Sequence, residues 1–334
     1  MLRKYILMIM IFAAFLADRP AALHAEAIRI GVSGSSIAFT PFYAAKQGGF
    51  FKKHGLEVEI VSITGATIVV QALLGGSIDF AIVGQALVRA AAQGADLVMV
   101  ASYMNRFPYT FMVKPTIKDV KELKGGKLAV SSFGAADELA QKITLERLGL
   151  NPEKDVTFLQ VGGQTARLTA LKAGSVDGTV FATPLSGVAK RMGFRELFKM
   201  QQLGIFYPHE GIVVSRGYIP SHRDTISRFL KAFIEAVHAM KTRKDFAISA
   251  MAAHLRLNPV KDREALEEGY EDEVLGHYER NPRPSAEAIK FVLDVMTKDG
   301  KVKLKSADPK DYIDTSFVDE LTKAGFIDAL YAKP

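Results

Sequence analysis

A segment of 22 residues occurs twice in this chain, and the duplication constrains the fold more than any other feature. Residues 63–84 read ITGATIVVQALLGGSIDFAIVG, and residues 161–182, which lie 98 positions later, read VGGQTARLTALKAGSVDGTVFA. Identical residues include Gly65/Gly163, Thr67/Thr165 and Asp79/Asp177. Solenoid repeats are about 20–50 residues long and recur several times. A period near 100 residues that is present twice instead predicts two similar lobes.

Both copies place the same elements in the same order. Apolar runs at 27–32, 56–61 and 78–83 are expected strands, and helices are expected between them. The second unit repeats this with a strand at 127–130 and a helix at 135–148. Strands that alternate with helices are typical of a parallel sheet covered by helices on both faces. We therefore predict an α/β fold with two lobes and a cleft between them.

Two further extended segments are predicted to connect the lobes. The run at 109–113 ends at Lys114-Pro115, and the run at 211–215 follows the second repeat. We therefore expect residues 27–113 in lobe one, 114–210 in lobe two, and 211–334 in a return to lobe one with added helices. In that last part, residues 225–243 carry apolar residues at helical spacing, which indicates a helix packed on the core.

The first 25 residues are predicted to lie outside the fold. Arg3 and Lys4 precede an apolar run from Tyr5 to Ala17, and small residues follow up to Ala25. This order is that of a secretory signal peptide. The apolar run is shorter than the roughly 20 residues that span a bilayer, although an uncleaved anchor is the alternative. We expect an exported, soluble chain in the periplasm.

Composition excludes several classes of function. The chain has no cysteine, which rules out disulfides, thiolate metal sites and a cysteine nucleophile. Its net charge is +7, and about +5 without residues 1–25, with Lys and Arg scattered among Asp and Glu. Nucleic-acid binding needs a concentrated basic face, so we expect no nucleic-acid partner. A mild positive field suits small anions.

The loops after the expected strands are the candidate binding site. In open parallel sheets, ligands bind beyond the carboxyl ends of the strands, where helix N-termini offer free N–H groups. These loops are rich in Gly, Ser and Thr in both copies. The candidate ligand contacts are Ser33, Gly34, Ser35, Gly65, Ala66, Thr67, Gly84 and Gln85 in lobe one, and Ser131, Ser132, Phe133, Gly134, Gly163, Gln164, Thr165 and Thr183 in lobe two.

Some isolated side chains join this set. Phe39 is a candidate apolar wall of the cleft, with ordinary packing as the alternative. Arg106 and the pair His209-Glu210 lie near the expected crossings, where a side chain can reach between lobes, and a solvated surface position is the alternative. Asp79 and Asp177 begin strands at the far end of the sheet, so we interpret them as turn-formers.

Catalytic signatures are absent from the sequence. It has no G-x-S-x-G, H-E-x-x-H, G-K-[ST] phosphate loop or G-x-G-x-x-G motif. The seven histidines are dispersed along the chain. We therefore expect no enzyme activity, no cofactor and no metal.

The opening of the mature chain resembles a known family. The loop Ser33-Gly34-Ser35 is followed by PFYAAK at 41–46 and GFFKKHGLEV at 49–58. With LGGSIDFA at 74–81 and LKAGSVD at 171–177, these segments resemble nitrate/sulfonate/taurine-type substrate-binding proteins, a group that includes binders of thiamine-pyrimidine precursors. The resemblance covers about residues 27–245.

The resemblance implies a type II periplasmic-binding-protein fold, with two α/β lobes, two crossover strands and a ligand enclosed between them. It also implies a monomer that captures a small organic anion or related metabolite and delivers it to an inner-membrane ABC permease. The ligand itself stays open among sulfonate, nitrate, carboxylate, pyrimidine and flavin. Two alternatives are an enzyme on the same fold that acts on a pyrimidine precursor and an exported ligand-sensing subunit.

Overall fold

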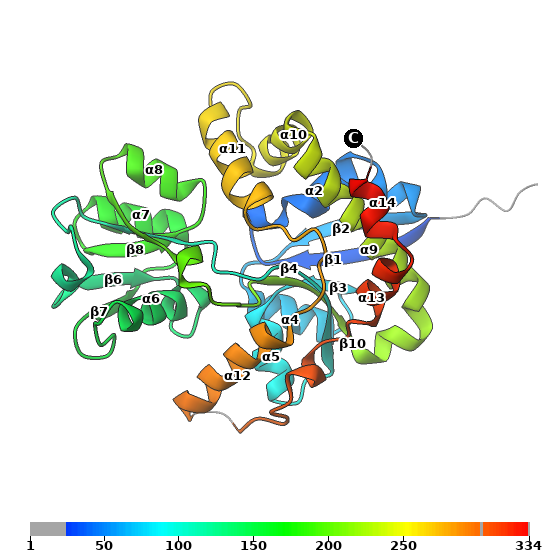
Figure 1. Ribbon diagram of the computed structural model, residues 1–334, viewed down its shortest axis with the longest axis horizontal. Helices are drawn as coiled ribbons and strands as arrows, with labels where there is room; N and C mark the ends of the chain where they lie inside the picture. The colour runs from blue at the N-terminus through cyan, green and yellow to red at the C-terminus, as the bar shows by residue number, and fades with distance from the viewer. Residues whose placement is uncertain (1–24, 301–302, 333–334) are drawn as a thin grey trace, which may run out of the picture.

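Two five-stranded sheets lie side by side in the computed structural model, each with its own helices (Figure 1). The structure describes residues 25–300 and 303–332. The predicted signal peptide falls almost entirely outside these residues. None of the helices in the described ranges combines the length and the apolar composition that a membrane-spanning helix requires.

The first sheet has the strand order β2-β1-β3-β10-β4. Strand β1 pairs in parallel with β2 and β3, whereas β10 runs antiparallel between β3 and β4. The bounds are β1 (Glu26–Val32), β2 (Leu56–Ser62), β3 (Phe80–Ile82), β4 (Leu97–Met104) and β10 (Glu210–Ser215). The strand that returns from the second sheet thus inserts near the edge of the first.

The second sheet repeats this plan with the order β7-β6-β8-β5-β9. Strand β6 pairs in parallel with β7 and β8, and β5 runs antiparallel between β8 and β9. The bounds are β5 (Thr110–Val113), β6 (Lys127–Val130), β7 (Thr157–Gln160), β8 (Gly178–Phe181) and β9 (Arg195–Lys199). Both sheets are therefore mixed rather than fully parallel, because each receives one strand from the chain as it crosses over.

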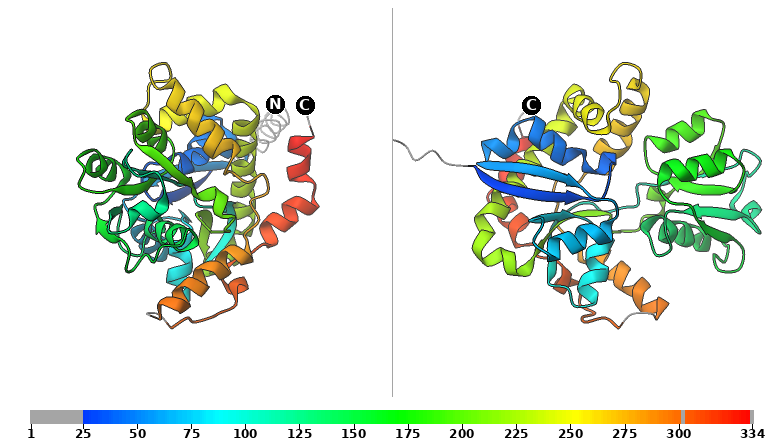
Figure 2. Two further views of the ribbon diagram at one scale, coloured as in Figure 1. Left: turned by 60° about the vertical axis from the view of Figure 1, so that its left-hand side comes forward. Right: turned by 180° about the vertical axis from the view of Figure 1, so that it is seen from behind.

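The position of β5 differs from the expectation that lobe one extends to Val113. Strand β5 pairs within the second sheet, so the chain leaves the first sheet after Met104. It returns before Glu210, where β10 begins. Figure 2 shows these two connections passing between the sheets.

Helices pack on both faces of each sheet. In the first repeat these are α2 (Thr40–Gln47), α3 (Phe50–Lys53), α4 (Ala66–Leu74) and α5 (Gln85–Ala92), and in the second α6 (Ala136–Arg147), α7 (Gln164–Lys172) and α8 (Leu185–Arg191). The C-terminal part adds α9 (Ile219–Thr242), α10 (Lys244–Leu255), α11 (Arg263–Gly269), α12 (Ala286–Asp299), α13 (Ser316–Lys323) and α14 (Phe326–Tyr331). A π-helical turn at Tyr270–Leu275 follows α11.

The apolar stripe predicted on the long C-terminal helix is core. Ile226, Phe229 and Phe233 of α9 are fully buried and join the cluster under the first sheet. Phe229 stacks on Phe80 with ring centroids 4.3 Å apart. Burying such side chains stabilises the fold by roughly 1.5–3 kcal/mol each. The C-terminal helices are therefore an integral part of the first lobe.

The repeated aspartates fasten neighbouring strands. Asp79 Oδ2 accepts the backbone N–H of Arg29 at 2.7 Å, and Asp177 Oδ2 accepts that of Lys127 at the same distance. Each link joins the residues just before the third strand of a repeat to its first strand, at Arg29 within β1 and at Lys127 at the start of β6. Neither aspartate lines the cleft described below, in agreement with their predicted position at the far end of the sheet. Their carboxylates, however, bond to a neighbouring strand rather than closing their own turns.

Candidate functional site

A cleft of about 690 Å³ opens between the two sheets. The loops that follow β1, β2 and β3 line it from the first sheet, and the loop after β6 lines it from the second. Both crossing segments contribute its back wall through Tyr109, Tyr207, His209 and Glu210. The duplicated plan therefore brings the first loop of each repeat, at Ser33 and at Ser131, to one cavity.

The two crossing segments pack against each other behind the cleft. Phe107 of the first crossing stacks on Tyr207 of the second, with ring centroids 3.9 Å apart, and both rings are buried. Gly84 lies where the return crossing passes, since a Cβ at this position would lie 1.9 Å from the carbonyl oxygen of Pro208. Only glycine allows the α5 loop to approach the crossing so closely.

Helix α5 presents a guanidinium group to the cleft. Arg89 lines the cavity, and its Nη1 lies 3.5 Å from the position of a Cβ built on Gly134 of the second lobe. One orientation of the Gln85 amide satisfies both neighbours. In it, the amide oxygen accepts a hydrogen bond from Arg89 Nε at 2.7 Å, and the amide nitrogen donates to the Tyr207 hydroxyl. Gln85 thereby fixes the arginine in the gap between the lobes.

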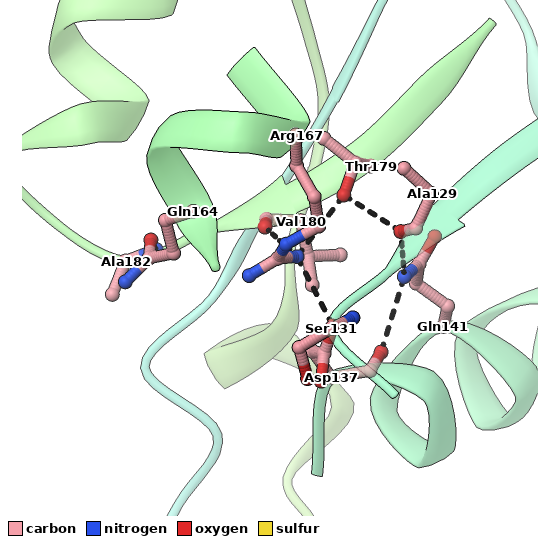
Figure 3. Close-up of polar contacts among 9 residues, drawn as sticks. All are labelled: Ala129, Ser131, Asp137, Gln141, Gln164, Arg167, Thr179, Val180 and Ala182. Atoms are coloured by element: carbon pink, nitrogen blue, oxygen red, sulfur yellow. Dashed lines mark hydrogen bonds and ion pairs between the residues drawn. The ribbon is translucent and has the colours of Figure 1, made fainter. Parts of the chain in front are cut away.

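Acidic residues in the first turn of α6 bond to the facing loop of the second lobe, and Figure 3 shows one of them, Asp137. Asp137 accepts both the backbone N–H of Ser131 at 2.6 Å and its hydroxyl at 2.5 Å. Arg167 of α7 pairs with Asp137 at 3.2 Å and is itself buried. Glu138 accepts the backbone N–H of Gly134 and pairs with Lys142 at 2.9 Å. These carboxylates thus bond to N–H groups of the loop before α6, whereas the N-cap residue Ala135 carries no side-chain cap.

Burial shifts the pKa values of two titratable groups of the return crossing toward their neutral forms. Burial, with a smaller contribution from His277, lowers the pKa of His209 to about 3. Burial also raises the pKa of Glu210 well above its usual value. His209 Nδ1 and Glu210 Oε2 have no hydrogen-bond partner among the described residues. Buried polar groups are normally paired, so these two atoms are candidates for ligand contact.

Most of the predicted ligand contacts lie in or beside this cleft. Those that line it are Ser33, Gly65, Ala66, Thr67, Gly84, Gln85, Ser131, Ser132, Phe133, Gly134 and His209. Gly34, Ser35, Phe39, Arg106, Gly163, Gln164, Thr165 and Thr183 are not among its lining residues. That the lining residues bind ligand stays a prediction.

Several of the remaining candidates have other partners. Phe39 is buried in the core of the first lobe. Arg106 places its guanidinium over the Phe206 ring, 5.1 Å from the centroid. Gln164 Oε1 accepts the Ala182 N–H at 2.8 Å, and the Thr183 hydroxyl donates to Asp272 at 3.0 Å.

Sequence reasoning missed Arg89 and Tyr109, and it placed Glu210 near a crossing without counting it among the ligand contacts. Arg89 sits within an alanine-rich helix, and Glu210 precedes an apolar strand, so each is a single polar residue without a motif. The signal available for Glu210 was its position at the start of the return strand, where its side chain meets the crossing. Among the described residues, no three His, Asp or Glu side chains gather as a metal site.

Solved structures of similar shape define the class of fold. The periplasmic aliphatic sulphonate binding protein SsuA from Escherichia coli matches with a TM-score of 0.70 at 22% identity, over 86% of this chain and 97% of SsuA. The periplasmic nitrate-binding protein NrtA from Synechocystis PCC 6803 matches with a TM-score of 0.71 at 15% identity, over 90% of this chain and 89% of NrtA. The chain thus has the predicted fold of periplasmic binding proteins.

The family follows from the sequence. The model of the family described as NMT1/THI5 like matches residues 36–247, well over half of the chain, so the chain belongs to this family. YtlA of Bacillus subtilis, provisionally named a binding protein, is 24% identical over 63% of this chain and 64% of YtlA. A Haemophilus influenzae protein provisionally named for thiamine biosynthesis is 29% identical over 50% of this chain and 51% of its own length. The chain therefore spans about half to two thirds of these relatives.

Proposed function

We propose that this chain is the extracytoplasmic solute-binding component of an ABC importer. It captures a small polar metabolite in the cleft and presents the closed form to a membrane permease. The observation that carries this proposal is the cleft lined from both sheets, with the stacked pair Phe107 and Tyr207 at its back. Closure of two lobes around a ligand is how periplasmic binding proteins work.

The comparisons support this function. Both solved structures described above are named as periplasmic binding proteins, for sulphonates and for nitrate. Residues 1–25, with the pattern of a signal peptide, agree with export to the periplasm. We also propose that the protein acts as a monomer.

The polar side chains of the cleft favour binding over catalysis. The hydroxyl of Ser131 donates to Asp137, and that carboxylate is paired with Arg167 rather than with a histidine. A serine nucleophile requires an adjacent general base that takes its proton. The carboxylate beside Ser131 is held in an ion pair by Arg167, and the contact orders the loop before α6.

A thermal-shift screen of the chain from Glu26 onward tests the proposal. We expect at least one compound among sulfonates, carboxylates, nitrate, amines, pyrimidines and flavins to raise the melting temperature, because a ligand that binds only the folded state stabilises it by mass action. The compound should be recovered chemically unchanged. If the purified chain instead converts a compound into product, the importer function is contradicted in favour of an enzyme.

A further inference from the structure

We propose that the segment from α11 through the π-helical turn is an electrostatic latch, which holds the second lobe in the orientation that lets both lobes line the cleft. The latch consists of three acidic residues of this segment, Glu264, Glu268 and Asp272, and of the basic residues of the second lobe that face them. None of these residues lines the cleft. The latch therefore acts on how freely the lobes move and makes no contact with a ligand.

The segment has two faces with different roles. Leu266, Tyr270 and Val274 recur every four residues, are at most 5% exposed, and lie in the core of the first lobe. Tyr270 also donates its hydroxyl to the carbonyl of Lys241 in α9 at 3.1 Å. The three acidic residues have the same interval but are offset by two residues, which places them on the opposite side of a helix. The apolar face thus fixes the segment to the first lobe and leaves the acidic face for the second.

Ion pairs connect the acidic face to the second lobe. The guanidinium of Arg191, at the end of α8, lies 3.4 Å from the Glu268 carboxylate and 3.7 Å from that of Glu264. The ammonium of Lys199 in β9 lies 3.8 Å from the Asp272 carboxylate. Each pair joins an acidic residue of the first lobe to a basic residue of the second, so the two surfaces are complementary in charge.

Two closer contacts lie within the same interface. The Thr183 hydroxyl donates to Asp272 at 3.0 Å, and Thr183 is only 7% exposed. Gly187 of α8 faces Glu268 so closely that a Cβ on this residue would overlap the carboxylate. Figure 1 shows α8 and α11 beside each other. The lobes are therefore in direct contact here, and the charges act at short range.

These contacts are of the size that sets the position of a lobe rather than the stability of the fold. An exposed ion pair alone contributes little to folding, and the pairs of the latch are partly exposed. Two arrangements of the lobes that differ little in free energy exchange readily, so weak contacts can decide between them. A ligand that needs both lobes binds more weakly in proportion to the fraction of the protein in which the lobes are misplaced. Loss of the latch should therefore lower affinity while every residue that lines the cleft is retained.

Measurements of the distance between spin labels test the latch directly. Labels on Lys46→Cys of α2 and Lys172→Cys of α7 report the two lobes from exposed positions outside the latch. We expect Arg191→Glu, which places a negative charge opposite the two glutamates of the latch, to broaden the distance distribution. Arg195→Glu makes the same charge change at an exposed position on β9 of the second lobe, and this matched control should leave the distribution unchanged.

Ionic strength separates the electrostatic contribution from packing. A salt concentration of about 1 M reduces the Debye length to about 3 Å, so it should broaden the distribution of the natural chain toward that of the Arg191→Glu chain. The Arg191→Glu chain should not broaden further, because its attraction is already lost. Both effects are required. If either the substitution or the salt leaves the distribution of the natural chain unchanged, the electrostatic latch is overturned.

Ligand binding then tests what the latch does. For a compound found in the thermal-shift screen, we expect Arg191→Glu to lower the affinity by roughly three- to tenfold, and Arg195→Glu to leave it unchanged. Equal or tighter binding by the Arg191→Glu chain would contradict a latch that favours the binding arrangement. This last comparison rests on the proposed function, whereas the distances are measured without ligand. A screen that yields no compound therefore contradicts the proposed function, and the distances still decide whether the latch exists.

Discussion

At the scale of single residues, burial without a partner marks the unusual carboxyl groups of this protein. Glu273, in the π-helical turn, is 2% exposed, and its Oε2 is unpartnered among the described residues. Burial, with a smaller contribution from Asp272, raises the pKa of Glu273 to about 8. The folded protein therefore keeps a proton that the unfolded chain releases near pH 4.5.

This shift makes stability depend on pH. Since the folded state binds the proton more tightly, the free energy of unfolding should fall as pH rises from about 4.5 to 8. Glu273→Gln cannot release this proton in either state, so its stability relative to the natural protein should increase over the same interval. Urea unfolding at pH 5 and pH 8 measures the difference. The exposed neighbour Glu271→Gln is the control, and parallel pH profiles for Glu273→Gln and the natural protein would contradict the assignment.

Sequence reasoning at this scale succeeded for residues that repeat and missed those that do not. The duplicated glycines, serines and threonines identified the loops around Ser33, Gly65 and Ser131, all of which reach the cleft. Arg89 and Glu210 belong to no repeated pattern, since the burial of Glu210 and the neighbours of Arg89 arise only on folding. A single sequence does not show either property.

At the scale of elements, the segment from α11 through the π-helical turn bridges the two lobes. Its apolar residues Leu266, Tyr270 and Val274 pack in the core of the first lobe. Its acidic residues meet the second lobe, where Asp272 accepts the Thr183 hydroxyl at 3.0 Å and Glu268 pairs with Arg191 at 3.4 Å. Figure 1 shows α11 beside α8. The lobes therefore touch here as well as at the crossings.

This contact gives Thr183 a structural role that can be separated from ligand binding. Thr183 is 7% exposed, and Thr183→Val removes the donor to Asp272 while keeping the shape of the side chain. We expect the free energy of unfolding to fall by about 1 kcal/mol, the usual net value of one hydrogen bond. Urea unfolding measures the loss, with the exposed Thr116→Val as the control. Unchanged stability with weakened ligand binding would instead support the role of Thr183 as a ligand contact.

Helices and strands could be predicted from the sequence where the spacing of apolar residues was regular. The strands of both repeats and the buried face of α9 follow from their apolar patterns. The mixed character of the sheets could not be predicted from these patterns, because β5 and β10 carry the same apolar signal whichever sheet they join. The start of α9 also differs. The helix begins at Ile219 rather than near residue 225, and its backbone is kinked at His222.

At the scale of the whole molecule, the duplication explains the architecture. Two sheets built on the same plan each receive one strand from the crossings, and the first loop of each repeat reaches the shared cleft. The narrow, stacked contact of Phe107 with Tyr207 is where rotation of one lobe relative to the other would be accommodated. The central claim is that a ligand is captured by the approach of the two lobes.

A distance measurement across the cleft tests this claim most directly. The chain has no cysteine, so spin labels can be placed on Gln71→Cys of α4 and Lys172→Cys of α7, two exposed positions in different lobes. A pair within the first lobe, Gln71→Cys with Lys46→Cys, is the control. We predict that a ligand found in the screen shortens and narrows the distance distribution between the lobes and leaves the control pair unchanged. An interlobe distribution that stays the same at saturating ligand would contradict capture by lobe closure.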